Sequence, residues 1–152
     1  MIGVLGGMGP AATVDFMGKL VRLTSATADQ DHIPLVVMSD PRIPDRVAPI
    51  LDGRGASPAA AMVERAEALE RAGAAALAIP CHTAHYWAFE VQAAVSLPLL
   101  HIVDAVLADL ERRQATKGSI GLLATAATLK AGLYQSKLEK AGYHCLLPDD
   151  EL

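Results

Sequence analysis

Short apolar runs alternate with longer stretches along almost the whole chain. The runs predict buried strands at residues 2–5, 34–38, 74–79, 97–102, 119–124 and 143–147. The stretches between them predict helices at residues 11–27, 58–72, 84–95, 103–113 and 126–141. Strands that alternate with helices are typical of an α/β fold, in which a mainly parallel sheet lies between two helical layers and the crossovers are right-handed.

Boundary residues support one of these helices and leave one long loop. Ser57 is a good N-cap, Pro58 suits the first helical position, and Gly73 is a good stop signal. Residues 39–56 contain three prolines and predict a long polar loop. From this pattern we expect three strands to be parallel neighbours in one sheet, namely residues 2–5, 34–38 and 74–79.

The composition is typical of a globular cytoplasmic protein. Apolar residues make up 52% of the 152 residues, and the formal net charge is −4. We therefore expect no basic surface for nucleic acid or for an anionic membrane. No apolar run reaches the roughly 18 residues of a membrane span. The two cysteines lie far apart, and the start at Met1 lacks the charged region of a signal peptide, which favours free thiols in a reducing compartment.

Cys81 lies where the predicted strand 74–79 passes into the predicted helix 84–95. Ligands of open α/β sheets bind outside the carboxyl ends of the strands, and the start of a helix favours the reactive thiolate. The segment Cys81-His82-Thr83-Ala84-His85 adds polar side chains at the same corner. An isolated cysteine is more often a small buried hydrophobe, but this cluster favours a functional thiol.

A glycine turn follows the first strand. The segment Gly7-Met8-Gly9-Pro10-Ala11-Ala12 fits a loose dinucleotide pattern. The acidic residue expected after the next strand has only Asp40 as a candidate, and Asp40 comes late. The glycines also let backbone N–H groups approach a small anion such as a carboxylate. A tight turn with no binding role remains the alternative.

Other polar residues allow more than one interpretation. Arg46 offers a planar fork for a carboxylate, although a loop arginine is more often solvated. Thr125 and Thr128 either bind a carboxylate or cap a helix, and capping is favoured from spacing alone. His85 either pairs with Cys81 as in nucleophilic catalysis or packs in the core, and His101 lies near a strand end. No trusted zinc pattern occurs, so no metal is expected.

Two further observations concern the second part of the chain. Cys145 falls inside the predicted strand 143–147, with no helix start or polar cluster around it, and is expected in the core. The segment from Ile2 to Gly6 is echoed by the segment from Ile120 to Ala124. Cys81 lies 78 residues after Gly3, and the same offset from Gly121 falls near position 199. If the echo marks two related halves, the second half is expected to be incomplete.

Five motifs, taken in order, resemble the aspartate/glutamate racemases, within the superfamily of Asp/Glu/hydantoin racemases. They cover nearly the whole chain. The motifs are Gly6-Gly7-Met8-Gly9-Pro10-Ala11-Ala12-Thr13, Pro44-Asp45-Arg46, Pro80-Cys81-x-Thr83-Ala84-His85, Leu100-His101-Ile102 and Gly121-Leu122-Leu123-Ala124-Thr125.

The resemblance implies a fold and an activity. It implies one complete α/β domain at residues 1–100 and the beginning of a second, incomplete one at residues 101–152. The implied enzyme is a cytoplasmic amino-acid racemase that uses neither pyridoxal phosphate nor a metal and is commonly a homodimer. One cysteine from each half faces each side of the substrate α-carbon, in the cleft between the halves.

Site residues also follow from the resemblance. It implies that Cys81 is the first catalytic cysteine and that Thr83 and Thr125 bind the substrate carboxylate, with Thr128 as a further candidate. The glycine turn near Met8 would line the cleft. It implies that Arg46 holds the acidic side chain of aspartate or glutamate.

The chain departs from the family pattern at two places. His82 stands where the family usually has asparagine, so the contact of this position with substrate is altered. The late Gly-Cys-Thr-Glu segment with the second cysteine does not occur. We therefore expect a longer racemase whose second cysteine lies beyond Leu152. The alternatives are an incomplete protein that only binds an acidic amino acid, and a one-cysteine enzyme such as a decarboxylase.

Overall fold

A four-stranded parallel sheet forms the first part of the molecule. In the computed structural model, which describes residues 1–148, its strand order is β2-β1-β3-β4. The strands are β1 (Ile2–Gly6), β2 (Leu35–Ser39), β3 (Ala76–Ala78) and β4 (Leu99–Leu100). In the register, Val4 pairs with Val37 of β2 and with Ala78 of β3. The predicted parallel pairing of the first three strands is confirmed.

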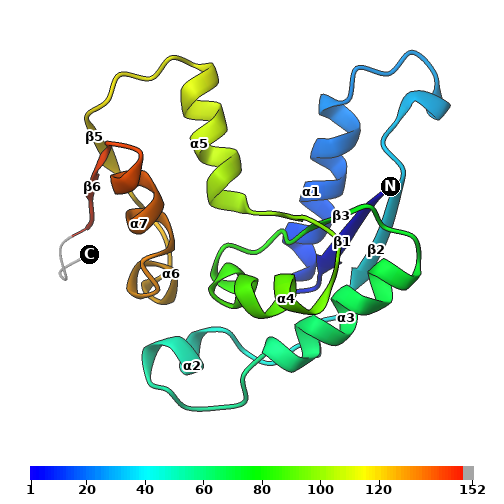
Figure 1. The fold of residues 1–152 in the computed structure, drawn as a ribbon, viewed down its shortest axis with the longest axis horizontal. Helices are drawn as coiled ribbons and strands as arrows, with labels where there is room; N and C mark the ends of the chain where they lie inside the picture. The colour runs from blue at the N-terminus through cyan, green and yellow to red at the C-terminus, as the bar shows by residue number, and fades with distance from the viewer. Residues whose placement is uncertain (149–152) are drawn as a thin grey trace.

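Helices cover both faces of this sheet (Figure 1). They are α1 (Pro10–Leu23), α3 (Ala59–Arg71) and α4 (Ala88–Ala94). A Cβ atom at Gly3 would meet Leu69 of α3, whereas one at Gly6 would meet Thr13 of α1. Residues three apart on a strand point to opposite faces. The helices α1 and α3 therefore lie on opposite sides of β1, and the predicted three-layer α/β fold is confirmed.

The second part of the chain forms a smaller parallel sheet with its own helices. Strands β5 (Ser119–Gly121) and β6 (His144–Leu146) pair in parallel. The helices are α5 (Ile102–Arg112), α6 (Ala126–Lys130) and α7 (Leu133–Lys140). Figure 1 shows this sheet and α7 on the far side of α5 from the first sheet.

Each part has its own buried cluster of apolar side chains. The first cluster includes Leu5, Met62, Leu77 and Trp87. The second is formed by Val103, Tyr134, Leu138 and Tyr143, with Ile120 and Cys145 packed against it. The division into domains at residues 1–100 and 101–152 stays a prediction, and residues 149–152 lie outside the described part of the chain.

Four predicted segments were wrong in detail. The predicted loop 39–56 contains a short helix, α2 (Val47–Leu51), because the Asp45 carboxylate accepts hydrogen bonds from the N–H groups of Val47 and Ala48. The predicted helix 126–141 breaks into α6 and α7 at Gly132, whose φ is 66°. Glycine adopts this left-handed conformation without the steric cost that other residues incur.

The other two differences lie at helix starts and ends. The helix predicted at 11–27 ends at Leu23, because Thr24 is extended, and a short 3₁₀ turn, η1 (Asp29–Asp31), precedes β2. The helix predicted at 84–95 begins as a 3₁₀ helix, η2 (Thr83–Trp87), and continues as α4. Among the described residues, no helix combines the length and the apolar character needed to cross a membrane.

Candidate active site

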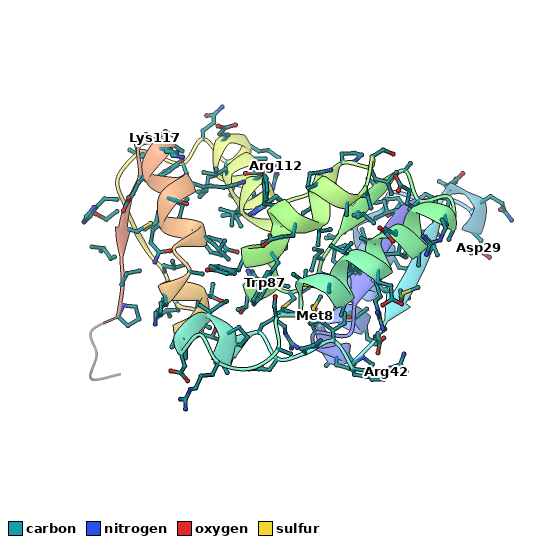
Figure 2. The ribbon with its side chains drawn as sticks, turned by 60° about the horizontal axis from the view of Figure 1, so that its bottom comes forward. Met8, Asp29, Arg42, Trp87, Arg112 and Lys117 are labelled. Carbon is teal, nitrogen blue, oxygen red and sulfur yellow. The ribbon has the colours of Figure 1, made fainter. Side chains whose placement is uncertain are left out.

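The glycine turn between β1 and α1 is held by close backbone packing. Gly7 has a φ of 94°, and a Cβ atom on it would lie 2.4 Å from backbone atoms of Asp40. The Gly7 N–H donates to Thr13 Oγ1 at 2.9 Å, so the first turn of α1 closes over the loop. This packing fixes the position of Met8, the next residue. Figure 2 shows Met8 near Trp87, and both side chains belong to the first apolar cluster.

Cys81 follows β3 at the carboxyl edge of the sheet. Its N–H donates to the carbonyl of Ile79 at 2.8 Å, which turns the chain away from the strand direction. The 3₁₀ helix η2 begins two residues later, at Thr83. The structure therefore confirms that Cys81 lies between a strand and a helix, although the first turns are 3₁₀ and not α-helical. The thiol side chain is partly buried.

His85 supports the chain around Cys81 with both of its ring nitrogens. The Ile102 N–H donates to Nε2 at 3.2 Å, which leaves Nδ1 as the protonated nitrogen that donates to the Cys81 carbonyl at 2.8 Å. Burial is the main cause that lowers the pKa of His85 to about 4. Of the two interpretations of His85, the structure favours the packing residue. His101 caps α5, since its Nδ1 accepts from the Val103 N–H.

Three threonine hydroxyls meet across the two parts of the chain. Thr128 is buried, and its Oγ1 lies 2.7 Å from Thr83 Oγ1 and 3.0 Å from Thr125 Oγ1. Thr125 also caps α6, since its Oγ1 accepts from the Thr128 N–H at 3.4 Å. The capping role and the clustering with Thr83 are thus both present. We call Thr83, Thr125 and Thr128 the threonine cluster.

His82 makes a second bridge between the two parts. Its Nδ1 lies 2.6 Å from the phenol oxygen of Tyr134, a buried residue of α7. Partial loss of water around the imidazole lowers the pKa of His82, and the same effect raises the pKa of Tyr134. Both side chains are therefore neutral near pH 7.

The two bridges border a pocket of about 450 Å³ between the two parts of the chain. Most of the residues predicted for the site line it, namely Met8, Cys81, His82, Thr83, Thr125 and Thr128. The remaining lining residues are Ala12, Pro80, Leu122, Leu123, Ala124 and Tyr134. The pocket thus joins a thiol, three hydroxyls and an imidazole–phenol pair in one apolar setting.

Arg46 is not among the residues that line this pocket. Its Nη1 donates to the carbonyl oxygens of Ile43 and Pro44, at 3.3 and 2.9 Å, within its own loop. The predicted role of Arg46 at an acidic side chain stays a prediction.

Cys145 is also not among the residues that line the pocket. It is in the middle of β6 and packs against the second apolar cluster, as expected. Burial and the charge of Glu139 raise the pKa of its thiol.

Asp40 lines a separate cavity, just after the end of β2. Its carboxylate accepts hydrogen bonds from the guanidinium groups of Arg42 and Arg65, and these arginines hold its pKa well below the usual range. The backbone of Asp40 packs against Gly7. The loose dinucleotide interpretation of the turn is therefore replaced by a structural one, because Asp40 is already paired. Over residues 1–148, no three His, Cys, Asp or Glu side chains gather in a way that could hold a metal ion.

Tyr134 is the polar pocket residue that the sequence did not reveal. It lies inside the stretch predicted as one helix, where nothing marks it as a site residue. The available signal was Gly132, because a helix restarted after a glycine can turn a new face toward the first part of the chain.

Comparison with known proteins supports one family for the whole chain. A model of the Asp/Glu/Hydantoin racemase family matches residues 5–152. The broad specificity amino-acid racemase RacX of Bacillus subtilis (strain 168) is 32% identical over 153 residues, which cover 98% of this chain and 65% of RacX. The chain spans slightly less than two thirds of that relative.

Solved structures give the same picture. The aspartate racemase of Picrophilus torridus is 35% identical, with a TM-score of 0.85, over 99% of this chain and 63% of that one. An aspartate racemase homologue from Pyrococcus horikoshii OT3 is 27% identical, with a TM-score of 0.79, over 99% of this chain and 65% of that one. The fold, the order of the motifs and the family match agree, and the chain belongs to the Asp/Glu/hydantoin racemase family.

Proposed function

We propose that this chain supplies one side of the active site of an amino-acid racemase, with Cys81 as one of two acid–base groups. One observation carries the proposal: Cys81 and the threonine cluster line the same pocket, between two parts of the chain. A thiol can act as a general acid or base, and hydroxyl donors beside it can hold the carboxylate of an amino acid, so this arrangement suits proton exchange at an α-carbon.

The threonine cluster has a hydroxyl proton available for a carboxylate. Three hydroxyl groups share two oxygen–oxygen contacts, at 2.7 and 3.0 Å. Each contact uses one proton, so one O–H remains for a bound ligand. Hydrogen bonds to a charged acceptor are stronger than those between neutral groups. The cluster is therefore proposed to hold the α-carboxylate and so to fix the α-carbon near Cys81.

In the proposed reaction, the Cys81 thiolate removes the α-proton, so that a C–H bond breaks and an S–H bond forms. A second protonated group returns a proton to the opposite face of the carbanion. General acid–base groups of this kind contribute about 10²–10⁴-fold to the rate. Cys145 is in β6 and does not line the pocket. We propose a second cysteine from sequence outside these 152 residues, as the length of the relatives also suggests.

Aspartate and glutamate are the proposed substrates. The names of the family and of the Picrophilus relative support this choice, whereas RacX carries a name of broad specificity. Arg46 would have to exchange its bonds to the carbonyls of Ile43 and Pro44 for a bond to the substrate side chain. No cofactor takes part in the proposed reaction. A homodimer and a cytoplasmic location are further proposals from the family resemblance.

Deuterium exchange tests this function. The complete product of the gene is incubated with L- or D-aspartate in D₂O, α-deuteration is measured by NMR, and inversion is measured by chiral chromatography. We expect both enantiomers to be deuterated and inverted, and Cys81→Ser to abolish both effects. Cys145→Ser is the matched control and should retain activity. Inversion that survives in Cys81→Ser would contradict the proposal.

The same assay on the 152-residue chain separates the remaining mechanisms. Exchange without inversion indicates one-sided chemistry at Cys81, as in a one-cysteine enzyme. Protection of Cys81 by aspartate without any exchange indicates a binding protein. Full inversion by the 152-residue chain would contradict the proposed second cysteine, and would require another second base within the chain.

A further inference from the structure

The phenol of Tyr134 contacts the imidazole of His82 at the pocket. Its phenol oxygen lies 2.6 Å from Nδ1 of His82, and both residues line the pocket. Tyr134 comes from α7, whereas His82 is adjacent to Cys81 in the loop after β3. The contact thus reaches from the second part of the chain to the group beside the thiol.

The chemistry of the two groups decides which one donates. A phenol O–H is a good donor, and the unprotonated nitrogen of a neutral imidazole is a good acceptor. If Nδ1–H donated instead, the phenol proton would need another acceptor. Among the described residues, neither Tyr134 Oη nor His82 Nε2 has a second hydrogen-bond partner, so the greater donor strength of the phenol decides the direction. The O–H group therefore donates to Nδ1, and the ring proton of His82 is on Nε2.

We infer that Tyr134 is a positioning residue that holds His82 in its Nε2–H tautomer, so that a neutral N–H donor beside Cys81 can bind a carboxylate oxygen of the substrate. The part concerning the substrate rests on the proposed function. The tautomer does not, because it depends only on the contact between the two side chains.

The surroundings of His82 favour a neutral ring. The titratable groups near it are Tyr134 on α7, Cys81 on the same loop and His85 on η2. The pKa of His82 is lowered by the partial loss of water around it, and the pKa of His85 is lowered mainly by burial. Near pH 7 the donor is then uncharged, and it would orient a carboxylate without forming an ion pair.

His85 supplies an internal reference with the opposite proton position. Its Nε2 accepts from the Ile102 N–H, and its Nδ1 donates to the Cys81 carbonyl. Two histidines three residues apart in the sequence are therefore expected to have different tautomers, His82 with Nε2–H and His85 with Nδ1–H. This contrast can be measured without any enzymatic activity.

The test is long-range ¹H–¹⁵N NMR of the ring nitrogens at pH 7. In the wild-type chain, His82 is expected to have a protonated Nε2 and an unprotonated Nδ1, and His85 the reverse. In Tyr134→Phe, the His82 signals should move toward a mixture of tautomers, while the His85 signals remain. Tyr143→Phe is the matched control, since Tyr143 is also buried in the second cluster but its phenol contacts the Ala115 carbonyl.

Kinetics test the link to the substrate. Loss of the oriented donor should raise KM for aspartate about threefold to tenfold in Tyr134→Phe, with a smaller change in kcat. In a His82→Asn background, the amide donor needs no help from Tyr134, so the additional Tyr134→Phe change should not alter KM further.

The possible outcomes separate the tautomer of His82, its contact with substrate and the proposed function. A protonated Nδ1 on His82 in the wild-type chain would overturn the inference, whatever the enzyme does. The expected tautomers with an unchanged KM in Tyr134→Phe would overturn only the contact with substrate. Expected tautomers in a protein that never exchanges the α-proton would contradict the proposed function and leave the positioning role of Tyr134 intact.

Discussion

The imidazole of His85 holds the backbone of Cys81, with Nδ1 2.8 Å from the Cys81 carbonyl oxygen. Its other nitrogen accepts from the Ile102 N–H, at the start of α5. One buried side chain therefore connects the loop of the proposed acid–base cysteine to the segment that leads into the second part of the chain. This role requires a neutral ring, because a protonated Nε2 could not accept from Ile102.

Acid should therefore destabilise the protein through His85. The pKa of His85 is about 4 in the folded protein, compared with about 6.5 in an unfolded chain. Between these pH values the unfolded state binds more protons than the folded state. The contribution of His85 to the free energy of unfolding is therefore complete above about pH 6.5 and decreases as the pH drops toward 4. The difference in pKa corresponds to about 3 kcal/mol. Urea denaturation at several pH values measures the loss.

His85→Gln separates this effect from other acidic transitions. We expect a lower stability at pH 7, since one or both backbone partners lose a well-placed bond, at a cost of about 1–3 kcal/mol. The stability of this variant should then depend less on pH between 6.5 and 4. His144→Gln, at an exposed position of β6, should retain the wild-type pH dependence. An equally steep loss in His85→Gln would contradict the assignment.

Much of the fold was predictable because it depends on local patterns. Apolar runs such as those at β1 and β3 have to be buried, and alternation with helices favours parallel strands. The break at Gly132 and the short helix α2 were not predictable in this way. The break depends on the backbone conformation of Gly132, and α2 depends on the Asp45 carboxylate. A hydrophobic pattern predicts neither of these features.

The candidate site shows the same division. Cys81 was identifiable because it lies where a strand ends and polar residues cluster. Thr125 follows β5 of the other sheet, and only the family resemblance pointed to it. The partner of His82 was not identifiable, because Tyr134 lies 52 residues away and reaches it only through packing of the two parts. Arg46 was expected at the substrate from its motif, yet its guanidinium is directed to the backbone carbonyls of its own loop.

Gly7→Ala should strongly destabilise the glycine turn. The new Cβ atom would meet the Asp40 backbone at 2.4 Å, at a positive φ, and backbone atoms cannot move aside as a flexible side chain does. We expect a loss of more than about 2 kcal/mol in denaturant unfolding. Gly53→Ala also has a positive φ but meets no atom within 4 Å, so it should cost only about 1 kcal/mol. Equal losses would show that the close contact is unimportant.

Cys81 should react with iodoacetamide before Cys145. Cys81 lines the pocket, whereas burial and the charge of Glu139 raise the pKa of Cys145 and reduce its thiolate fraction near pH 8. Peptide mapping after brief labelling gives the ratio of the two sites, and aspartate should protect Cys81. Preferential labelling of Cys145 would refute this order of reactivity.

Thr128→Val should weaken substrate binding while it preserves the fold. Thr128 is buried, and its hydroxyl joins those of Thr83 and Thr125. Valine has nearly the same shape but removes the central hydroxyl, so the two remaining threonines lose their common partner. Because Thr83 and Thr125 then lose the contact that orients their hydroxyls toward the carboxylate, we expect KM for aspartate to rise about tenfold. Thr128→Ser should remain near wild type.

A threonine with no role in the pocket provides the control for this change. Thr24 lies at the end of α1, where its hydroxyl donates to the Leu20 carbonyl, and it does not line the pocket. Thr24→Val should leave KM unchanged, although it removes a threonine hydroxyl in the same way. Wild-type KM in Thr128→Val, with kcat and stability also unchanged, would show that the threonine cluster caps α6 and bridges the two parts without holding the substrate carboxylate.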